Sequence, residues 1–275
     1  MHTSALSEAD RGQRLSGNLP VPLRRLARRY SDWNYGWQAD IALRYVPVAD
    51  ALTYRPPSRP RRSSETSEVF LDVGCGSKGG VTSYLPVRTV GVDLAFNVGR
   101  IRRHPAVTPV IASGLALPVA DASVDVALCM DTLEHLSPAE RTQLIAELFR
   151  VVADDGLVIA GAPCGVEARR VEQAVNARYR QRTGSDHPWL AEHLEHEPLT
   201  PDGLTELMAS TANRRFERFD LEMVPNTNLA LWQRLQEQGP LAHLHRLIFQ
   251  PLWPWLRDRH EPPTYRQVCL VKSTR

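Results

Sequence analysis

The chain has 275 residues, of which 43% are hydrophobic and 23% charged, and its formal net charge is +2. This composition is ordinary for a globular protein with a full core, and the nearly balanced charge gives no sign of a nucleic-acid-binding surface. Four widely separated cysteines disfavour a disulfide framework or a zinc site and favour a reducing compartment. No stretch of the sequence is long and apolar enough to span a bilayer, and residues 1–19 lack the apolar part of a secretory signal, so we expect a cytoplasmic protein.

Residues 1–64 are predicted to form a helical cap and a linker, and residues 65–275 the main domain. Apolar residues recur at helical spacing within 22–30 and again within 33–46, which predicts two amphipathic helices. The segment 55–66 is rich in proline, serine and arginine, a composition typical of a solvated linker.

The segment from Val69 to Gly80 organises the main domain. Apolar residues with β-branched and aromatic members predict a buried strand over 69–73, and a glycine cluster follows it. A second apolar strand over 89–94 carries Asp93 near its carboxyl end. Glycines let a ligand lie against bare backbone, and a carboxylate in this place can accept hydrogen bonds from both hydroxyls of a ribose. The two elements together predict a bound nucleoside.

Strands and helices alternate through the rest of the domain. A helix is expected to begin after Ser137, because Ser137 and Glu140 have the capping-box spacing and Pro138 occupies the first helical position. It ends at a turn over 154–156. Further strands are predicted over 108–113, 124–129, 157–162, 215–223 and 265–272, and further helices over 166–181 and 201–210. This alternation predicts an α/β fold whose parallel sheet is followed by a late pair of strands.

Three blocks in this order resemble the class I S-adenosylmethionine-dependent methyltransferases, in the group that includes ubiquinone and other small-molecule methylases. The blocks are 71–76 (Leu-Asp-Val-Gly-Cys-Gly), 90–93 (Val-Gly-Val-Asp) and the span from Leu117-Pro118 to His135-Leu136. The resemblance implies a Rossmann-like fold with a seven-stranded, mostly parallel sheet and an antiparallel last strand. It also implies helical insertions at 165–210 and 225–262.

The same resemblance implies S-adenosylmethionine as the cofactor. Asp72 and the glycine turn would face its methionine part, Asp93 its ribose, and Leu94 its adenine. Ser113 stands where the family usually has an acid at the adenine amine, and Ser77-Lys78 replace a usual glycine. The cofactor-binding residues implied in this way are Asp72, Gly74, Cys75, Gly76, Asp93, Leu94, Ser113, Gly114 and Met130.

The candidate catalytic residues are Asp131 and His135, which follow the fourth strand. His135 either accepts a proton from a substrate hydroxyl or amine, or braces the loop into the next helix by hydrogen bonds. A second cluster of histidines and glutamates lies within 187–197, with His193 and Glu197 on one helical face. We interpret this cluster as an exposed helix surface and predict no metal site.

The predicted function is methyl transfer to an oxygen or nitrogen of a small-molecule or lipid-like acceptor, with no nucleic-acid partner expected. The aromatic segment 225–262 fits core packing, a lid over the acceptor, or peripheral contact with a membrane. Two alternatives stay open, a non-catalytic binding module that keeps the fold and an NAD-dependent oxidoreductase. The sequence does not fix the oligomeric state.

Overall fold

A computed structural model describes residues 39–54, 68–237 and 261–274. The predicted helix over 22–30, the whole predicted linker over 55–66 and most of the aromatic segment 225–262 lie outside these residues.

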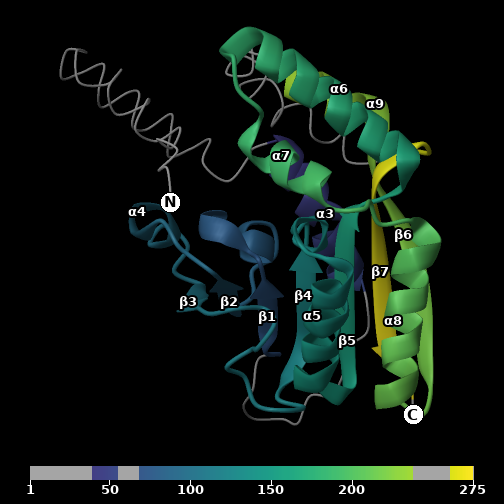
Figure 1. Ribbon diagram of the computed structural model, residues 1–275. Helices are drawn as coiled ribbons and strands as arrows, with labels where there is room; N and C mark the ends of the chain where they lie inside the picture. The colour runs from purple at the N-terminus through teal and green to yellow at the C-terminus, as the bar shows by residue number, and fades with distance from the viewer. Residues whose placement is uncertain (1–38, 55–67, 238–260, 275) are drawn as a thin grey trace, which may run out of the picture.

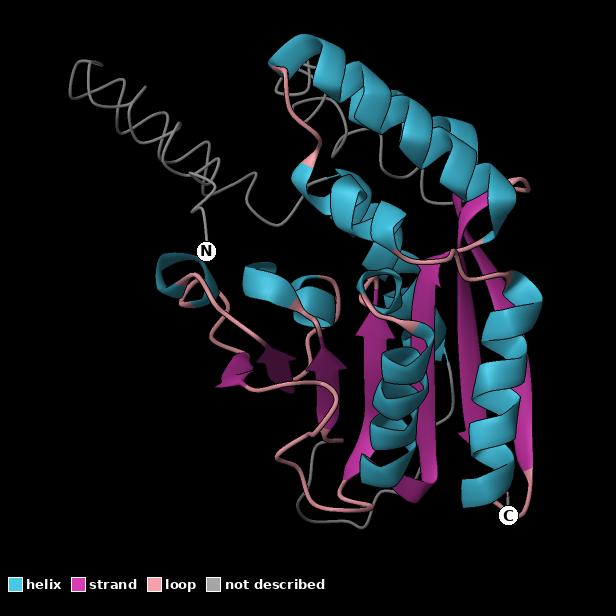
Figure 2. Cartoon of the chain, in the orientation of Figure 1, coloured by secondary structure: helices cyan, strands magenta, loops and turns pink. Residues whose placement is uncertain are grey.

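Within the described residues the strands form one seven-stranded sheet in the order β3-β2-β1-β4-β5-β7-β6 (Figures 1 and 2). Strands β1 to β5 pair in parallel, and β7 runs antiparallel to both of its neighbours, β5 and β6. The predicted sheet, with its antiparallel last strand, is confirmed. The strands are β1 (Phe70–Val73), β2 (Thr89–Asp93), β3 (Val107–Ile111), β4 (Val124–Met130), β5 (Val152–Pro163), β6 (Phe219–Asn228) and β7 (Thr264–Ser273).

The helices cover both faces of the sheet and the edge where the parallel strands end. In Figure 1, α5 and α8 lie on one face and α3 on the other, while α6 and α7 cross above the end of β4. The helices are α3 (Ala39–Tyr54), α4 (Val98–Ile101), α5 (Pro138–Val151), α6 (Gly165–Thr183), α7 (Pro188–Glu195), α8 (Pro201–Arg215) and α9 (Leu229–Glu237). Short 3₁₀ turns are η1 (Gly76–Lys78), η2 (Gly80–Ser83) and η3 (Leu133–His135).

Each face of the sheet has its own apolar core. On one face, Leu144 and Leu148 of α5 and Met208 of α8 pack against the sheet. On the other face, Tyr45 and Leu52 of α3 pack against strand residues such as Val126 and Ile159. The sheet is therefore buried on both sides, as expected for parallel strands.

Helix α5 begins where the sequence predicted. The Ser137 hydroxyl accepts a hydrogen bond from the Glu140 amide, and the Glu140 carboxylate accepts one from the Ser137 amide, which completes the capping box. Pro138 takes the first turn, where its missing N–H has no cost. This capping fixes where the chain turns from η3 into α5.

Several boundaries differ from the prediction. Helix α3 continues through Pro47, because its buried face extends to Leu52. Strand β5 begins at Val152 and takes in the predicted turn, which a register irregularity beside β4 absorbs. Strand β6 runs to Asn228, so the first residues of the predicted helical insertion at 225–262 belong to a strand.

Helix α8 runs to Arg215, which displaces β6 from the predicted range of 215–223. The Arg215 guanidinium donates hydrogen bonds to the carbonyls of Phe149 and Val152, at 3.1 Å each, and so ties the helix end to the sheet. None of the described helices combines the length and apolar character needed to cross a bilayer.

Candidate cofactor and acceptor site

The glycine turn after β1 leaves bare backbone at the carboxyl edge of the sheet. Gly74 has a φ of +75°, and a Cβ there would lie 2.0 Å from the Thr132 hydroxyl oxygen. Gly76 has a φ of +63°, and a Cβ there would meet no atom within 4 Å. The first glycine is therefore needed for packing, whereas the second faces open space where a ligand can approach the backbone.

Asp93 joins this turn to the end of β2. Its carboxylate accepts hydrogen bonds from the Gly76 amide at 2.9 Å and the Ala95 amide at 3.3 Å. The two motifs that the sequence linked to a nucleoside are thus adjacent. Leu94, predicted to lie against adenine, is 74% exposed beside them.

Asp72 lies beneath the turn and is fully buried. Its carboxylate accepts hydrogen bonds from the Val81 amide at 2.9 Å and the Tyr45 hydroxyl at 3.4 Å. Burial raises its pKa to about 7, against the lowering effect of these hydrogen bonds. Asp72 therefore braces η2 and α3 within the protein, and its contact with the methionine part of a cofactor stays a prediction.

Cys75 is buried beside Gly91 and acts as a small packing residue. Burial raises the pKa of its thiol well above the usual range, so the thiol stays protonated and unreactive. A Cβ on Gly91 would lie 2.7 Å from the Cys75 sulfur, which shows how closely β2 approaches the turn. Only the backbone of Cys75 is placed to contact a ligand.

The other predicted cofactor residues are partly or fully committed to the protein. The Ser113 hydroxyl accepts a hydrogen bond from the Leu115 amide at 3.1 Å. Gly114 packs against Val73, since a Cβ there would lie 2.9 Å from a Val73 methyl group. Met130 is fully buried in the core beneath α3. The roles of these three residues in cofactor binding stay predictions.

Asp131 follows β4 with a positive φ of 52°, and two arginines clamp its carboxylate. The Arg266 Nε donates to both carboxylate oxygens, at 2.8 and 2.6 Å, and the Arg44 Nε lies 2.9 Å from Oδ2. Burial acts to raise the pKa of Asp131, but Arg266 and Arg44 outweigh it and hold the pKa below its usual value. Arg266 also donates a hydrogen bond to the Thr227 hydroxyl at 2.9 Å.

Sequence reasoning missed both arginines. Arg44 lies on α3 and Arg266 on β7, so each reaches Asp131 only through the fold. The one available signal was an arginine just before the apolar run 268–271 of a predicted strand, because an arginine buried there needs a counter-charge.

The imidazoles of His135 on η3 and His193 on α7 face each other. Their Nε2 atoms lie 3.3 Å apart. The Nδ1 of His135 bonds to Glu192 at 2.9 Å, and the Nδ1 of His193 bonds to Glu172 at 2.8 Å. Glu172 also accepts a hydrogen bond from the Tyr265 hydroxyl at 2.8 Å.

The interpretation of 187–197 as exposed surface is wrong for His193, whose side chain is only 9% exposed. Helix α7 ends at Glu195, so His193 and Glu197 do not share a helical face. The burial comes from η3, which lies far from α7 in the sequence, and from α6, which precedes α7 directly.

Glu134 completes the cluster. Its side chain is 8% exposed, its Oε1 lies 3.9 Å from the His193 Nε2, and its Oε2 has no hydrogen-bond partner among the described residues. Burial, then Asp131, raises the pKa of Glu134 to about 8, while His193 opposes the rise.

The two histidines are shifted in opposite directions. Burial and the neighbouring His193 lower the pKa of His135, against the effect of Glu192. Burial acts to lower the pKa of His193 as well, but Glu172 and Glu134 outweigh it and raise the pKa. His193 is therefore the more basic imidazole of the pair.

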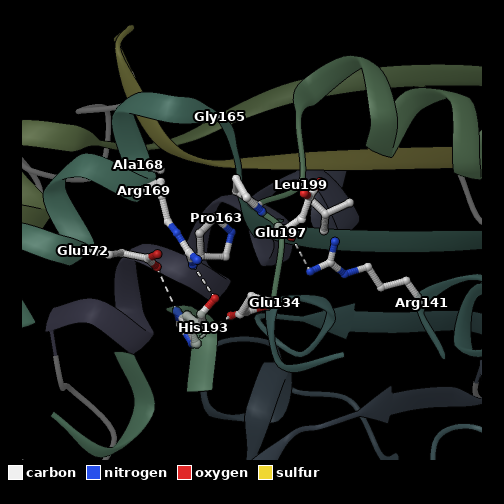
Figure 3. Close-up of a pocket in the computed structure, with 11 residues that line it drawn as sticks. Glu134, Arg141, Pro163, Gly165, Ala168, Arg169, Glu172, His193, Glu197 and Leu199 are labelled. Atoms are coloured by element: carbon white, nitrogen blue, oxygen red, sulfur yellow. Dashed lines mark hydrogen bonds and ion pairs between the residues drawn. The ribbon is translucent and has the colours of Figure 1, made fainter. Parts of the chain in front are cut away.

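A cavity of about 10 Å³ lies between η3, α6 and α7, with room for about one water molecule. Figure 3 shows the Arg169 guanidinium beside Glu172 and His193, and the Arg141 guanidinium on the opposite side of the cavity beside Glu197. Arg141 donates to the carbonyls of Leu133 and Glu197, at 2.9 and 2.8 Å. These bonds tie η3 to the segment that follows α7.

Comparison with known proteins matches parts of this chain to methyltransferases. Residues 71–160 match a family model described as a methyltransferase domain. The chain is 22% identical over 207 residues to the mouse protein "tRNA (carboxymethyluridine(34)-5-O)-methyltransferase ALKBH8", covering 71% of this chain and 30% of that protein. It is 33% identical over 97 residues to a Mycolicibacterium smegmatis protein named "Probable S-adenosylmethionine-dependent methyltransferase", covering 34% of this chain and 37% of that protein. The chain spans about a third of the length of these curated relatives.

Among solved structures, a SAM-dependent methyltransferase from Thermotoga maritima superposes with a TM-score of 0.50 at 15% identity. The superposition covers 91% of this chain and 97% of that one, and it supports the fold. The sheet order, the antiparallel β7 and the matched domain define an S-adenosylmethionine-dependent methyltransferase fold of class I. Residues 71–160 match the methyltransferase domain model, and the open backbone at Gly76 beside Asp93 fits S-adenosylmethionine as the cofactor.

Proposed function

We propose that this protein transfers a methyl group from S-adenosylmethionine to an oxygen or nitrogen of a small-molecule or lipid-like acceptor. One observation carries the proposal: the glycine turn with Asp93 and the imidazole of His135 follow neighbouring parallel strands of one sheet, whose carboxyl ends share an edge. That edge is where open α/β sheets bind their ligands.

The cofactor supplies a methyl group on a sulfonium, which is already an activated leaving group. The protein must mainly align the acceptor atom with that methyl group and exclude water. In this proposal Asp93 accepts hydrogen bonds from the ribose, the backbone at Gly76 lies against the cofactor, and Ser113 contributes one uncharged hydrogen bond at the adenine.

His135 is the residue that we propose accepts the acceptor's proton. Its side chain is 31% exposed and its lowered pKa keeps it neutral at pH 7, and the accepting atom in this proposal is Nε2, which would have to exchange its 3.3 Å contact with the His193 Nε2 for the acceptor. Glu192 fixes the ring through Nδ1. For Asp131 we propose a positioning role, because a carboxylate clamped by two guanidinium groups is a weak base but holds the chain between β4 and η3 in place.

Exposed apolar side chains on α6 and α7, the helices that cross the carboxyl edge of the sheet, support an apolar acceptor. Trp189 at the start of α7 and Val166 at the start of α6 are 57% and 62% exposed. The named activity of the mouse relative favours a second candidate acceptor, a tRNA. The balanced net charge gives less support to the tRNA candidate.

Calorimetric titration with S-adenosylmethionine, S-adenosylhomocysteine and NAD tests the cofactor part of the proposal. The wild-type protein should bind the first two and not NAD. The Asp93→Ala variant should lose at least about tenfold in affinity, because it removes charge-assisted hydrogen bonds to the ribose. The matched control is Asp220→Ala, an exposed acid on β6 at the far end of the sheet. Binding of NAD alone would refute the proposal.

Methyl transfer from cofactor labelled in its methyl group tests the acceptor part. The label should enter an organic-solvent extract of cellular small molecules and lipids, and this transfer should fall at least tenfold in His135→Ala. Label that enters tRNA alone would replace the proposed acceptor by the second candidate. Cofactor binding without transfer to either fraction would favour the non-catalytic alternative.

A further inference from the structure

The two facing imidazoles leave an electrostatic problem that the protein's own groups do not fully solve. Glu172 accepts hydrogen bonds from Tyr265 and His193 at 2.8 Å each, so the Nδ1 of His193 is the donor in its bond. Glu192 holds the Nδ1 of His135 in the same way. The remaining lone pair of each neutral ring then sits on Nε2, and these two atoms face each other at 3.3 Å. A cation must lie between them.

A proton is one such cation, but it only makes a hydrogen bond between the two Nε2 atoms. The Glu134 Oε2 would still be buried without a partner, although it belongs to the same cluster. An unpartnered buried carboxyl oxygen is costly, and the Glu134 carboxyl group also adjoins the imidazole pair, since its Oε1 lies 3.9 Å from the His193 Nε2. A metal ion would engage all three side chains at once.

The geometry fits a metal. Within the part of the chain that the structure describes, ligand atoms of Glu134, His135 and His193 all lie within 4.8 Å of one another. Two imidazole nitrogens bound tetrahedrally to one zinc ion at their usual bond length are roughly 3.3 Å apart, and that is the separation found between the two Nε2 atoms.

The surroundings fit a metal as well. Metal-binding histidines characteristically bond to a carboxylate through their other ring nitrogen, which fixes the tautomer and the orientation of the ring. Both histidines do so here, His135 to Glu192 and His193 to Glu172. Figure 3 shows the second of these bonds and the Glu134 side chain beside the His193 ring.

We propose that Glu134, His135 and His193 form a binding site for one divalent transition-metal ion of the zinc type. Two imidazoles and one carboxylate suit such an ion better than Mg²⁺ or Ca²⁺, which prefer oxygen ligands. Three protein ligands leave a coordination position for water or another ligand.

With the ion bound, both Nε2 atoms are ligands. The proton-accepting role proposed for His135 therefore belongs to the ion-free protein. Binding of the ion itself needs neither cofactor nor acceptor, so this inference can fail or succeed independently of the proposed function.

The test uses the full chain after removal of bound metal with a chelator, followed by dialysis. Zn²⁺ is titrated calorimetrically and the bound metal is counted by mass spectrometry, with Mg²⁺ as a comparison. We expect one equivalent of Zn²⁺ in the wild type, no comparable Mg²⁺ binding, and at least tenfold weaker Zn²⁺ binding in His135→Ala and in Glu134→Gln. The matched control, His196→Ala, removes a half-buried histidine just beyond α7 and should bind as the wild type does.

A second measurement keeps the test valid if a variant fails to fold. Co²⁺ added to the wild-type protein should give the intense visible bands of a four- or five-coordinate site, without the sulfur charge-transfer bands that cysteine ligands produce. Three results would overturn the proposal. They are no stoichiometric Zn²⁺ binding in the wild type, Zn²⁺ affinity unchanged in both His135→Ala and Glu134→Gln, or an equal loss of affinity in His196→Ala.

Discussion

Asp131→Asn perturbs the charge balance at the carboxyl end of β4 while keeping the shape of the side chain. The carboxylate is 6% exposed and lies between the Arg266 side chain, 2% exposed, and the Arg44 side chain, 20% exposed. The asparagine amide leaves both guanidinium groups without their counter-charge. Its NH2 group, a hydrogen-bond donor, would also face the N–H donors of the arginines.

Removing one member of a buried ion pair costs about 3–5 kcal/mol, because the remaining charge stays buried and uncompensated. Arg44 is partly exposed and can turn toward water, whereas Arg266 cannot. We therefore expect a loss of about 3 kcal/mol in the free energy of unfolding, which corresponds to roughly 6–12 °C in Tm for a chain of this size.

Urea denaturation at pH 7 measures this loss, and its dependence on pH checks the cause. The folded protein holds the pKa of Asp131 below its usual value, so the stabilisation is present above the unfolded-state pKa of about 4 and disappears as the pH falls through the folded-state pKa. The difference between wild type and variant should therefore persist at pH 7 and shrink only in strong acid.

Asp154→Asn is the matched control. Asp154 also pairs with an arginine, Arg215 at 2.6 Å, but its side chain is 75% exposed. A surface pair of this kind contributes about 1 kcal/mol or less. If Asp131→Asn costs no more than Asp154→Asn, the two-arginine clamp does not stabilise the fold and the reasoning is wrong.

Three further predictions follow from the glycine turn, the cap of α5 and the buried acid of β1. Gly76→Ala should cost only about 1 kcal/mol in the free energy of unfolding, because the new Cβ meets open space and only the positive φ disfavours it. The variant should nevertheless bind S-adenosylmethionine more weakly in calorimetry, and unchanged cofactor affinity would contradict the placement of the cofactor. Ser137→Ala should lower the free energy of unfolding by about 0.5–2 kcal/mol in urea denaturation through loss of the cap, and a neutral result would show that Pro138 suffices. The folded-state pKa of Asp72 is about 7, above its unfolded-state value, so the contribution of this group to stability should be full below about pH 4 and fall as the pH rises toward 7. Asp72→Asn should abolish this part of the pH dependence of the free energy of unfolding. An unchanged pH dependence would contradict the prediction.

Features that depend on local spacing could be predicted from the sequence. The capping box at Ser137 involves groups three residues apart. The glycine turn and Asp93 stand at the carboxyl ends of two parallel strands that are consecutive in the sequence and adjacent in the sheet. In both cases backbone geometry alone brings the groups together, so residue types and their spacing were sufficient.

Features that depend on long-range packing could not be predicted. Arg266 reaches Asp131 across 135 residues, and His193 reaches His135 across 58. Periodicity on α7 indicated only a polar helix, because the burial of His193 depends on where α6 and η3 lie. The continuation of α3 through Pro47 has the same origin, since tertiary burial overrides the local preference of proline.

The position of β7 within the sheet has a consequence for how the chain folds. This strand follows β6 in the sequence but lies between β5 and β6, and it pairs Cys269 with Ala160. Until β7 is in place, β5 presents an unpaired and almost wholly apolar edge from Leu157 to Pro163. Such an edge is a template for pairing with another chain. Folding of this domain should therefore be slow relative to helical proteins of similar size, and its intermediates should be the species most prone to aggregate.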